Sequence, residues 1–434
     1  MKIAIYTLGC KVNQYETQAM EQELVRRGHT ITDFDGPADA YIVNTCTVTA
    51  VSDKKCRNII RRARKSSPAA VVAACGCYAQ TKPEAVAALG VDLVSGSAGR
   101  MEFLERLERL LQSREGQVVE VDKTLSRRDF ERLPAGGAAG RTRAMLKVED
   151  GCVNFCAYCI IPYARGPVRS LPLDEAVEQA RRLAREGYRE VVLTGIEISS
   201  WGQDLKTGQI LADLIEAVCV AVPGLRVRLG SLEPRTVTED FCRRCVALPN
   251  LCPHFHLSLQ SGCDATLVRM NRKYSTARYY ESVGLLREFF SDPGITTDLI
   301  TGFPGETEEE FMRTMAFLEK CSFTAMHIFP YSRRPGTPAD AMPDQVPKRE
   351  KEERARRAIA LAARMERRWL ERQTGRTLPV LFEEEKDGWW QGHAPNYALV
   401  RAKGEGLHNR LLNVEITGVD GGTLAGVPRD EMKF

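Results

Sequence analysis

The sequence predicts an α/β protein in three parts: an N-terminal doubly wound domain, a central (β/α) barrel and a C-terminal small β-barrel. Three observations lead to this prediction. At 434 residues the chain is too long for one hydrophobic core. Short apolar runs alternate with helical patterns as far as Gly375, and closely spaced strand patterns follow. We place the divisions at residues 1–112, 113–141, 142–372 and 373–434, and interpret the second range as a linker.

The composition is typical of a globular protein with little net charge. Hydrophobic residues make up 43% of the chain and the formal net charge is +4, which is compatible with an RNA partner but does not indicate one. The N-terminus, "MKIAIYTLGCKVNQYE", lacks a signal-peptide pattern, and no stretch resembles a membrane span. We therefore expect a cytoplasmic protein with no membrane partner. Fourteen cysteines in a reducing compartment favour metal or redox chemistry over disulfides.

The N-terminal part alternates strand-like and helical segments. The predicted strands are "KIAIYTLG", "AYIVNT" and "AVVAACG", and helical periodicity appears in "NQYETQAMEQELVRRG" and "SDKKCRNIIRRARK". This order is typical of a parallel, doubly wound sheet. Each strand ends at a cysteine, namely Cys10, Cys46 or Cys77. Because ligands bind at the carboxyl ends of such strands, we predict that the three cysteines converge, although any one alone is more simply a small buried hydrophobe.

Two further cysteines, Cys56 and Cys75, compete for the same role. Cys77 immediately follows Gly76 at the predicted strand-to-helix turn, a position equivalent to that of Cys10. Cys75 lies two residues earlier, within the predicted strand, where its side chain would pack in the sheet. We therefore assign Cys77 to the predicted site.

The central part begins after a polar, glycine-rich stretch at residues 112–142. Strand patterns recur there with helical segments between them: "RAMLKVEDGC", "EVVLTGIEI", "LRVRLGSLEP", "HFHLSLQSG", "ITTDLITGFPG" and "TAMHIFPYSRRPG". This repeat predicts a partial or full barrel, with its active site at the carboxyl ends of the strands.

A group of three cysteines, Cys152, Cys156 and Cys159, follows the first predicted barrel strand in "EDGCVNFCAYCIIPYARG". The spacing Cys-x3-Cys-x2-Cys is too tight for ordinary disulfides and lacks the fourth ligand of a closed zinc site. Thiolates select soft metals and iron–sulfur clusters, and three thiolates around a four-iron cluster leave one iron open. We interpret this group as a ligand set for such a cluster, with zinc as the less favoured alternative.

The triplet at the first barrel strand resembles the radical S-adenosylmethionine superfamily. The motifs "TLGCKVNQYE", "VNTCTVT", "CGCYAQ", "GCVNFCAYCIIPYARG", "HLSLQSG", "MNRKY", "TTDLITGFPGET" and "PYSRRPGT" resemble, in order and over essentially the whole chain, the methylthiotransferases. Within that family, "TLGCKVNQYE" and "CIIPYARGPVRS" are most similar to the branch that acts on N6-threonylcarbamoyladenosine beside the anticodon of tRNA.

This resemblance implies a set of cofactors and partners. The cofactors are S-adenosylmethionine and two 4Fe-4S clusters, a radical cluster on Cys152, Cys156 and Cys159 and an auxiliary cluster on Cys10, Cys46 and Cys77. The implied reaction places a methylthio group on carbon 2 of the adenine. The implied partners are the tRNA anticodon stem-loop, a reducing electron donor and a sulfur donor.

The barrel motifs suggest residues that bind the S-adenosylmethionine. Gly195 and Glu197 lie in "LTGIE", which resembles the superfamily element that holds the methionyl amino group. The other candidates are polar residues of the strand-end motifs: Glu233, Ser258, Gln260, Arg269 and Asp298. For each of them the alternative is a structural role in capping a strand or helix.

The C-terminal part resembles the small RNA-binding TRAM-like domain of the same family. Before it, a long basic helix is predicted to pack Ile359, Leu361 and Met365 against the barrel. Aromatic and basic side chains of the predicted β-barrel are candidates for RNA contacts or for its own core: Trp389, Trp390, His393, Tyr397 and Arg401.

Three alternatives remain open at this point. The same scaffold would also suit methylthiolation of isopentenyladenosine in tRNA or of a ribosomal-protein aspartate. An alternative of a different class is a nonenzymatic RNA-binding protein with structural metal sites. Cys242 and Cys245 form a Cys-x2-Cys pair without a second pair, so zinc binding there is the less favoured interpretation.

Overall fold

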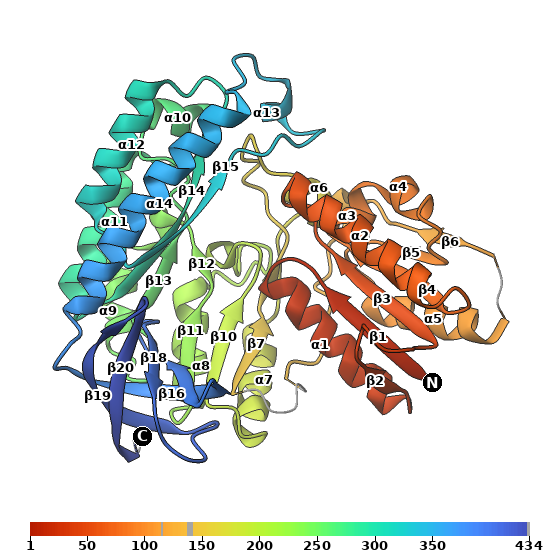
Figure 1. Cartoon of the computed structure of the whole chain (residues 1–434), viewed down its shortest axis with the longest axis horizontal. Coiled ribbons are helices and arrows are strands. Elements are labelled where there is room, and N and C mark those ends of the chain that lie inside the picture. Colours follow the sequence, from red (N-terminus) through yellow and green to blue (C-terminus); the bar gives the residue numbers. More distant parts are fainter. Residues whose placement is uncertain (114–115, 137–141, 432–434) are drawn as a thin grey trace.

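The computed structural model describes residues 1–113, 116–136 and 142–431 (Figure 1). Parts of the predicted linker, 113–141, and the end of the predicted C-terminal range, 373–434, lie outside the described residues. An N-terminal α/β domain stands beside a central barrel, and a small β-barrel lies at one end of the central barrel (Figure 1). Every helix in the described part of the chain is too short or too polar to span a bilayer.

The N-terminal domain is built on a six-stranded parallel sheet. In spatial order its strands are β2 (Thr30–Thr32), β1 (Lys2–Thr7), β3 (Ala40–Thr45), β4 (Val71–Gly76), β5 (Leu93–Ser95) and β6 (Val118–Glu120). Strand β6 lies within the stretch interpreted from sequence as a linker, so the sheet continues past residue 112. The sequence prediction missed this strand because β6 has only three residues and forms the exposed edge of the sheet.

Helices cover both faces of this sheet, as the predicted doubly wound fold requires. One face carries α1 (Lys11–Arg26) and α5 (Arg100–Ser113). The other carries α2 (Ala50–Ser66), α3 (Cys77–Thr81) and α4 (Pro83–Ala87). Strands β3 and β4 are buried along their whole length because helices pack on both sides of them.

The central domain is a partial barrel of parallel strands surrounded by helices. Its strands are β7 (Arg143–Lys147), β10 (Glu190–Thr194), β11 (Arg226–Leu229), β12 (Ser231–Leu232), β13 (His254–Leu257), β14 (Gly294–Thr301) and β15 (Ala325–Pro330). They form two sheets, β11-β10-β7 and β12-β13-β14-β15, and β12 follows β11 after a single residue. The outer helices are α7 (Leu173–Arg185), α8 (Leu211–Ala221), α9 (Glu239–Val246), α10 (Asp264–Arg269), α11 (Thr276–Phe289), α12 (Glu308–Cys321) and α14 (Lys348–Glu371).

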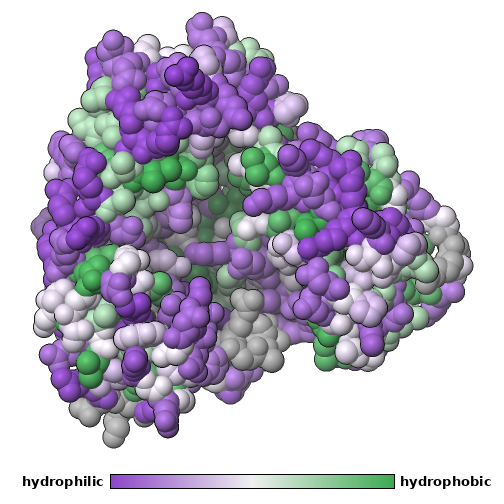
Figure 2. All heavy atoms as spheres, in the orientation of Figure 1, coloured by the Kyte–Doolittle hydropathy of each residue, from purple (hydrophilic) through white to green (hydrophobic). Residues whose placement is uncertain are grey.

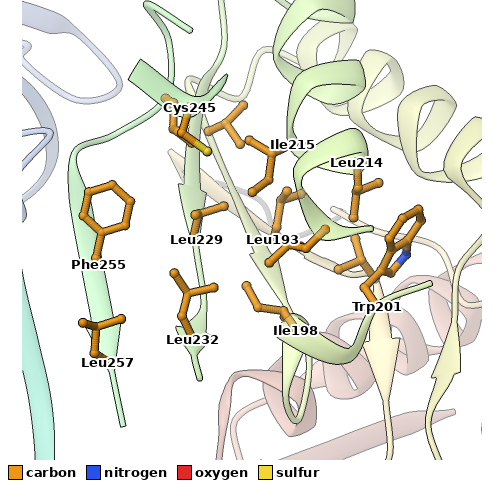
Figure 3. Close-up of a cluster of buried hydrophobic side chains, with 14 of the residues drawn as sticks. Leu193, Ile198, Trp201, Leu214, Ile215, Leu229, Leu232, Cys245, Phe255 and Leu257 are labelled. Carbon is orange, nitrogen blue, oxygen red and sulfur yellow. The ribbon is translucent and has the colours of Figure 1, made fainter. Parts of the chain in front are cut away.

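The largest hydrophobic core lies between these strands and helices (Figure 3). Leu193, Leu229 and Phe255 point from the strands toward Ile215 of α8. Cys245 lies among these apolar side chains, and Cys242 and Cys219 are buried in the same cluster. Their surroundings are those of small core hydrophobes, which gives no support to the zinc interpretation of the Cys242–Cys245 pair.

Helix α14 packs against β15 and α12 with one apolar face. Leu361 and Met365 are buried, as predicted, but Ile359 is 51% exposed, so its predicted packing is wrong. Residues four apart lie on one face of a helix, whereas Ile359 is two residues from Leu361 and points to the other side. Ala358 occupies the buried position instead.

The C-terminal part is the predicted small β-barrel. It is closed in the order β16 (Thr377–Lys386), β17 (Trp389–His393), β18 (Leu399–Ala402), β20 (Thr423–Glu431) and β19 (Leu411–Asp420). Closure pairs every strand on both sides and leaves no open edge. Phe382, Val400 and Val414 fill its interior.

A loop of this small barrel closes the amino-terminal end of the central barrel. Arg228 donates hydrogen bonds to the carbonyl oxygens of Ala394 and Pro395, at 3.3 and 2.8 Å. The ring of Tyr397 stacks on His254 with centroids 4.4 Å apart. It also stacks on His393 at 4.7 Å. Tyr397 and His393 are therefore part of a domain interface.

A buried ionic network joins the N-terminal domain to the central barrel. Glu16 of α1 accepts from Arg165 at 2.6 Å and from Arg100 at 2.8 Å, and Lys147 of β7 lies 3.5 Å away. All four side chains are fully buried. Arg165 also contacts Asp150 at 3.2 Å. Burial alone would raise the pKa of Glu16, but the three basic side chains around it outweigh burial and lower that pKa.

A second buried contact joins the same two domains. Arg334, from the segment after β15, pairs with Asp53 of α2 at 3.0 Å and donates to Thr47. Nearby, the backbone N–H of Ala50 donates to Ser332 at 3.1 Å. Two separated polar contacts therefore fix the orientation of the N-terminal domain.

The Glu16→Gln substitution should destabilise the protein strongly. It leaves three buried cations without their shared carboxylate, which should lower the free energy of unfolding by about 3–5 kcal/mol. Denaturant titration would measure this change. Glu23→Gln, on the same helix, is the matched control, since Glu23 pairs with exposed Arg26 and should cost about 1 kcal/mol or less. Equal effects of the two substitutions would contradict the assigned role of the network.

The same network predicts a pH dependence of stability. The folded-state pKa of Glu16 is lowered below its ordinary value of 4.5. Its contribution is therefore complete above that value and is lost as the pH falls below it. As the pH falls below 4.5, the free energy of unfolding of the wild-type protein should therefore decrease more steeply than that of Glu16→Gln. If the two proteins lost stability equally with falling pH, the prediction would be contradicted.

Candidate functional site

The cysteines of the N-terminal domain meet at one edge of its sheet. Strands β1, β3 and β4 are adjacent and parallel, and Thr45 pairs in register with Gly76 at the ends of β3 and β4. Cys10, Cys46 and Cys77 follow these strands and interact electrostatically with one another. We call these residues the N-terminal triplet.

Glycines shape two of the turns that present this triplet. Gly9 has a φ of +116° and Gly76 a φ of +96°, conformations that side chains rarely adopt. A Cβ atom at Gly76 would lie 2.5 Å from the carbonyl oxygen of Thr45, and one at Gly9 would lie 3.2 Å from the Cys46 Sγ. Both turns therefore depend on glycine, directly before Cys10 and Cys77.

The two competing cysteines of this domain have other surroundings. Cys75 is fully buried in the hydrophobic cluster between the sheet and helices α1 and α5, and burial raises its pKa to about 11. The Cys56 thiol donates to the Cys46 carbonyl oxygen at 3.3 Å. It also accepts from the Cys46 N–H at 3.4 Å. Cys56 thus supports the turn that carries Cys46.

The second group of cysteines lies in the loop between β8 (Glu149–Asp150) and α6 (Ile161–Arg165). We call Cys152, Cys156 and Cys159 the barrel triplet. The loop is held by hydrogen bonds from Cys152 N–H to Gly166 O at 3.0 Å and from Cys159 N–H to Cys156 O at 2.9 Å. Burial raises the pKa of the Cys152 thiol, and the neighbouring Cys159 and Cys156 thiols raise it further, which indicates that the three thiols lie close together.

The two triplets lie close to each other across the domain interface. Helix α3, which begins at Cys77, packs against α6, which follows Cys159. Cys159 and Cys77 also interact electrostatically. In the space-filling view, the surface is hollowed between the two lobes of the molecule (Figure 2). This juxtaposition of the two triplets arises only in the folded chain.

The donor sets suit iron–sulfur clusters better than single ions. In the described ranges, no three His, Cys, Asp or Glu side chains are arranged to hold one metal ion. In a four-iron cluster each thiolate binds a different iron atom, so its ligands stand farther apart. Arg272 donates to the Cys156 Sγ at 3.2 Å, which suits a negatively charged cluster.

Three acidic side chains line the barrel end beside the barrel triplet; Glu149 and Glu233 are buried and Glu197 is partly buried. Glu149 accepts from the Glu197 N–H at 2.7 Å, and its other carboxyl oxygen has no hydrogen-bond partner in the described part of the chain. Glu197 interacts electrostatically with both Cys152 and Glu233. Burial raises the pKa of Glu149 and of Glu197. These acids fit a ligand with positively charged amino and sulfonium groups. Glu233 already pairs with Arg235, at 2.9 Å.

The other residues that the sequence predicts to bind the cofactor differ in their contacts. Gly195 lies directly beside Glu149, and a Cβ atom there would stand 2.6 Å from the Glu149 Oε2. Ser258 accepts at its backbone oxygen from Tyr274, at 2.6 Å. The Gln260 N–H donates to the Asp298 carbonyl oxygen, at 2.9 Å. The Asp298 side chain pairs with His256 at 3.2 Å.

Arg269, a predicted cofactor contact, and Arg272, which the sequence did not single out, have different surroundings. Arg269 is paired with Glu310 of α12 and donates to the carbonyl oxygen of Gly305, so its guanidinium is already engaged there. Arg272, in the same "MNRKY" region, instead contacts the Cys156 thiol and the Ser258 carbonyl oxygen. The sequence signal that could have identified Arg272 is its place inside the motif "MNRKY". Only the fold shows that this arginine, and not Arg269, faces the cysteines.

Two family descriptions match this chain. Residues 146–318 match the Radical SAM superfamily. Residues 2–96 match a family described as Uncharacterized protein family UPF0004. The fold and the barrel triplet therefore define a radical S-adenosylmethionine protein with an added N-terminal domain.

Full-length relatives specify the family further. The chain is 38% identical over 440 residues to Threonylcarbamoyladenosine tRNA methylthiotransferase MtaB of Bacillus subtilis, a match that covers 100% of this chain and 96% of the relative. It is 39% identical to the protein of the same name from Aquifex aeolicus, over 89% of this chain and 93% of the relative. It is 33% identical to the tRNA-2-methylthio-N(6)-dimethylallyladenosine synthase of Acetivibrio thermocellus, over 97% of this chain and 89% of the relative. The chain belongs to the methylthiotransferase family of radical S-adenosylmethionine enzymes.

A solved structure supports the fold. The radical S-adenosylmethionine methyltransferase TsrM from Kitasatospora setae, with cobalamin and a [4Fe-4S] cluster bound, aligns with a TM-score of 0.56. The alignment covers 78% of this chain and 77% of that chain, at 17% sequence identity. The predicted fold class is thereby confirmed.

Cys77→Ala and Cys75→Ala should separate a cluster ligand from a packing residue. If each triplet binds a four-iron cluster, as the sequence predicts, Cys77→Ala should lose about half of the iron bound after anaerobic reconstitution, because one cluster loses a ligand. Cys75→Ala should keep the full iron content and cost about 1 kcal/mol of stability or less. Iron analysis and denaturant titration measure these effects. Iron loss in the Cys75 variant alone would reverse the assignment.

Proposed function

We propose that this enzyme methylthiolates carbon 2 of N6-threonylcarbamoyladenosine adjacent to the anticodon of tRNA. The observation that carries the proposal is the meeting of two cysteine triplets at one domain interface. The chain also resembles, along its whole length, relatives named for this nucleoside. The proposal divides the chain into an N-terminal domain that extends through β6, the central barrel, and a TRAM-like RNA-binding barrel.

In this proposal the two triplets hold one 4Fe-4S cluster each. Cys152, Cys156 and Cys159 would carry the radical cluster, and the N-terminal triplet would carry the auxiliary cluster. When bound, these groups and S-adenosylmethionine supply the electron, the radical and the methylthio sulfur, and the chain supplies their placement. An electron donor and a sulfur donor are further partners, and we expect the reaction to occur in the cytoplasm.

The residues of the chain have separate tasks at this site. Glu149, Glu197 and Glu233 suit the cationic end of S-adenosylmethionine, with Gly195 leaving room beside Glu149. Arg272 orients the Cys156 thiol by its hydrogen bond. The buried network described above keeps the two triplets at a fixed spacing, which favours reaction by fixing the geometry of the reactants.

The small β-barrel offers a surface for tRNA. The guanidinium of Arg401 lies over the Trp389 ring at 4.7 Å, and Lys403 lies 5.1 Å from the same ring. An aromatic ring beside two cations suits a base and its phosphates. Tyr397 and His393 were also candidates for this role, but they pack in the interface with the central barrel.

Nucleoside analysis tests the proposed substrate. Cells that lack this protein should accumulate N6-threonylcarbamoyladenosine and lose its methylthio form, as measured by mass spectrometry of digested tRNA. The wild-type gene should restore the product. A Cys152→Ala, Cys156→Ala, Cys159→Ala triple variant should not, because the open iron has no support without these thiolates. Loss of the methylthio form of isopentenyladenosine instead, or an unmethylthiolated ribosomal protein, would favour one of the alternatives.

Trp389→Ala should weaken tRNA binding without disturbing the fold. Loss of one stacking platform costs about 1–3 kcal/mol of binding free energy, or about 5- to 150-fold in Kd. Filter binding or fluorescence anisotropy would measure it at fixed salt. Trp390→Phe is the control, since Trp390 packs against the small-barrel core. Unchanged affinity in the Trp389 variant would assign RNA binding elsewhere.

Removing the whole small barrel is a poorer test of RNA binding, because the deletion would also expose Arg228 and His254 of the central barrel.

A further inference from the structure

Lys11 is an unpaired cation beside the N-terminal triplet. It is the first residue of α1 and directly follows Cys10. Among the described residues, its ammonium group makes no hydrogen bond or ion pair. The side chain is accessible to solvent, yet enough protein surrounds it to lower the pKa of its ammonium group by desolvation. Exposure inside a largely enclosed space is characteristic of a recess, and the molecule is hollowed between its two lobes (Figure 2).

Helix α1 turns this side chain toward the central barrel. Tyr15 lies one turn after Lys11 and therefore on the same face of the helix. The Tyr15 ring lies 5.7 Å from the ammonium of Lys147 on β7, and Tyr15 is buried in the barrel core cluster. The face of α1 that carries Lys11 therefore looks onto β7, at the edge of the barrel next to the N-terminal domain (Figure 1).

The wall opposite Lys11 is rich in positive charge. Lys11 interacts electrostatically with Arg228 and Arg143 of the barrel strands and with Glu190. Glu190 is already shared by Arg228 at 2.7 Å and by Arg226 at 2.5 Å. Arg143 pairs with Glu383 at 2.6 Å. Positive groups outnumber negative ones in this layer, and Lys11 alone among its cations has no partner in the described chain.

We propose that this recess binds the carboxylate of the threonylcarbamoyl group, with Lys11 as its direct ligand and Arg143 and Arg228 as the supporting positive field. The inference rests on the proposed function and adds the determinant of substrate choice. The threonylcarbamoyl group ends in a carboxylate, whereas a dimethylallyl group is a hydrocarbon with no charge. An unpaired cation in a positive recess would bind the carboxylate of the threonylcarbamoyl group. It would stay unpaired beside a dimethylallyl group, so the enzyme would discriminate between the two substrates.

The position of Lys11 in the chain fits the geometry of such a substrate. Carbon 2 must approach the N-terminal triplet to receive sulfur in the proposed reaction, and Cys10 belongs to that triplet. The substituent on N6 extends from the same edge of the adenine ring. A cation on the residue next to Cys10 is therefore well placed to contact the end of that substituent.

The test compares charged and neutral substrates. Anticodon stem-loop RNA would carry either N6-threonylcarbamoyladenosine or its analogue with a carboxamide in place of the carboxylate. Wild-type enzyme should lose about 10- to 100-fold in kcat/KM on the amide, the range expected for a charge-assisted contact. Lys11→Met should lose a similar factor on the acid and show no preference between acid and amide. Lys11→Arg should restore part of the preference for the acid.

The outcomes distinguish between the anionic groups that Lys11 could bind. If Lys11 instead contacted an RNA phosphate or the carboxylate of S-adenosylmethionine, Lys11→Met would weaken reaction with acid and amide equally, which would overturn the proposal. Lys65→Met, at the exposed end of α2, controls for the general loss of positive charge. Equal activity of the wild-type enzyme on acid and amide would also overturn the proposal, and this comparison needs no variant. Activity on neither RNA would contradict the proposed function itself.

Discussion

The carboxylate of Glu16 is the interaction on which the arrangement of the site depends. It comes from the N-terminal domain, and it is shared in a fully buried position by Arg100 of its own domain and by Arg165 and Lys147 of the barrel. A buried carboxylate of this kind tolerates little displacement, because each cation would otherwise be desolvated without compensation. Arg165 closely follows the barrel triplet in the chain. The network therefore fixes the separation between one set of cysteines and the other.

This constraint explains why the proposed reaction site lies between domains. The N-terminal sheet presents its cysteines at the carboxyl ends of adjacent parallel strands, and the barrel presents its own triplet after the strand that begins the barrel. Either set alone is a common way to hold a ligand. Packing of α3 on α6 turns the two sets toward each other, and Lys11 of α1 follows directly after one of these cysteines. The same rigid packing positions both the proposed reaction and the proposed choice of substrate.

The small β-barrel contributes in two distinct ways. One of its loops closes the amino-terminal end of the central barrel through Tyr397 and the carbonyl oxygens that Arg228 binds. Trp389, outside that loop, lies beside the two cations Arg401 and Lys403. Aromatic residues of one short segment therefore divide between packing and a surface suited to RNA. Their sequence spacing gives no indication of that division, because it depends on which part of the small barrel meets the central barrel.

The sequence by itself determined the fold class, the alternation of strands and helices, and the two groups of cysteines, because these depend on periodicity and on local spacing. It also favoured Cys77 over Cys75, since the glycine before Cys77 marks a turn whose backbone geometry is local. The tertiary structure decided the rest. It placed the short edge strand β6 in the sheet and Arg272 beside Cys156. These outcomes depend on contacts between residues far apart in the chain, which no local pattern encodes.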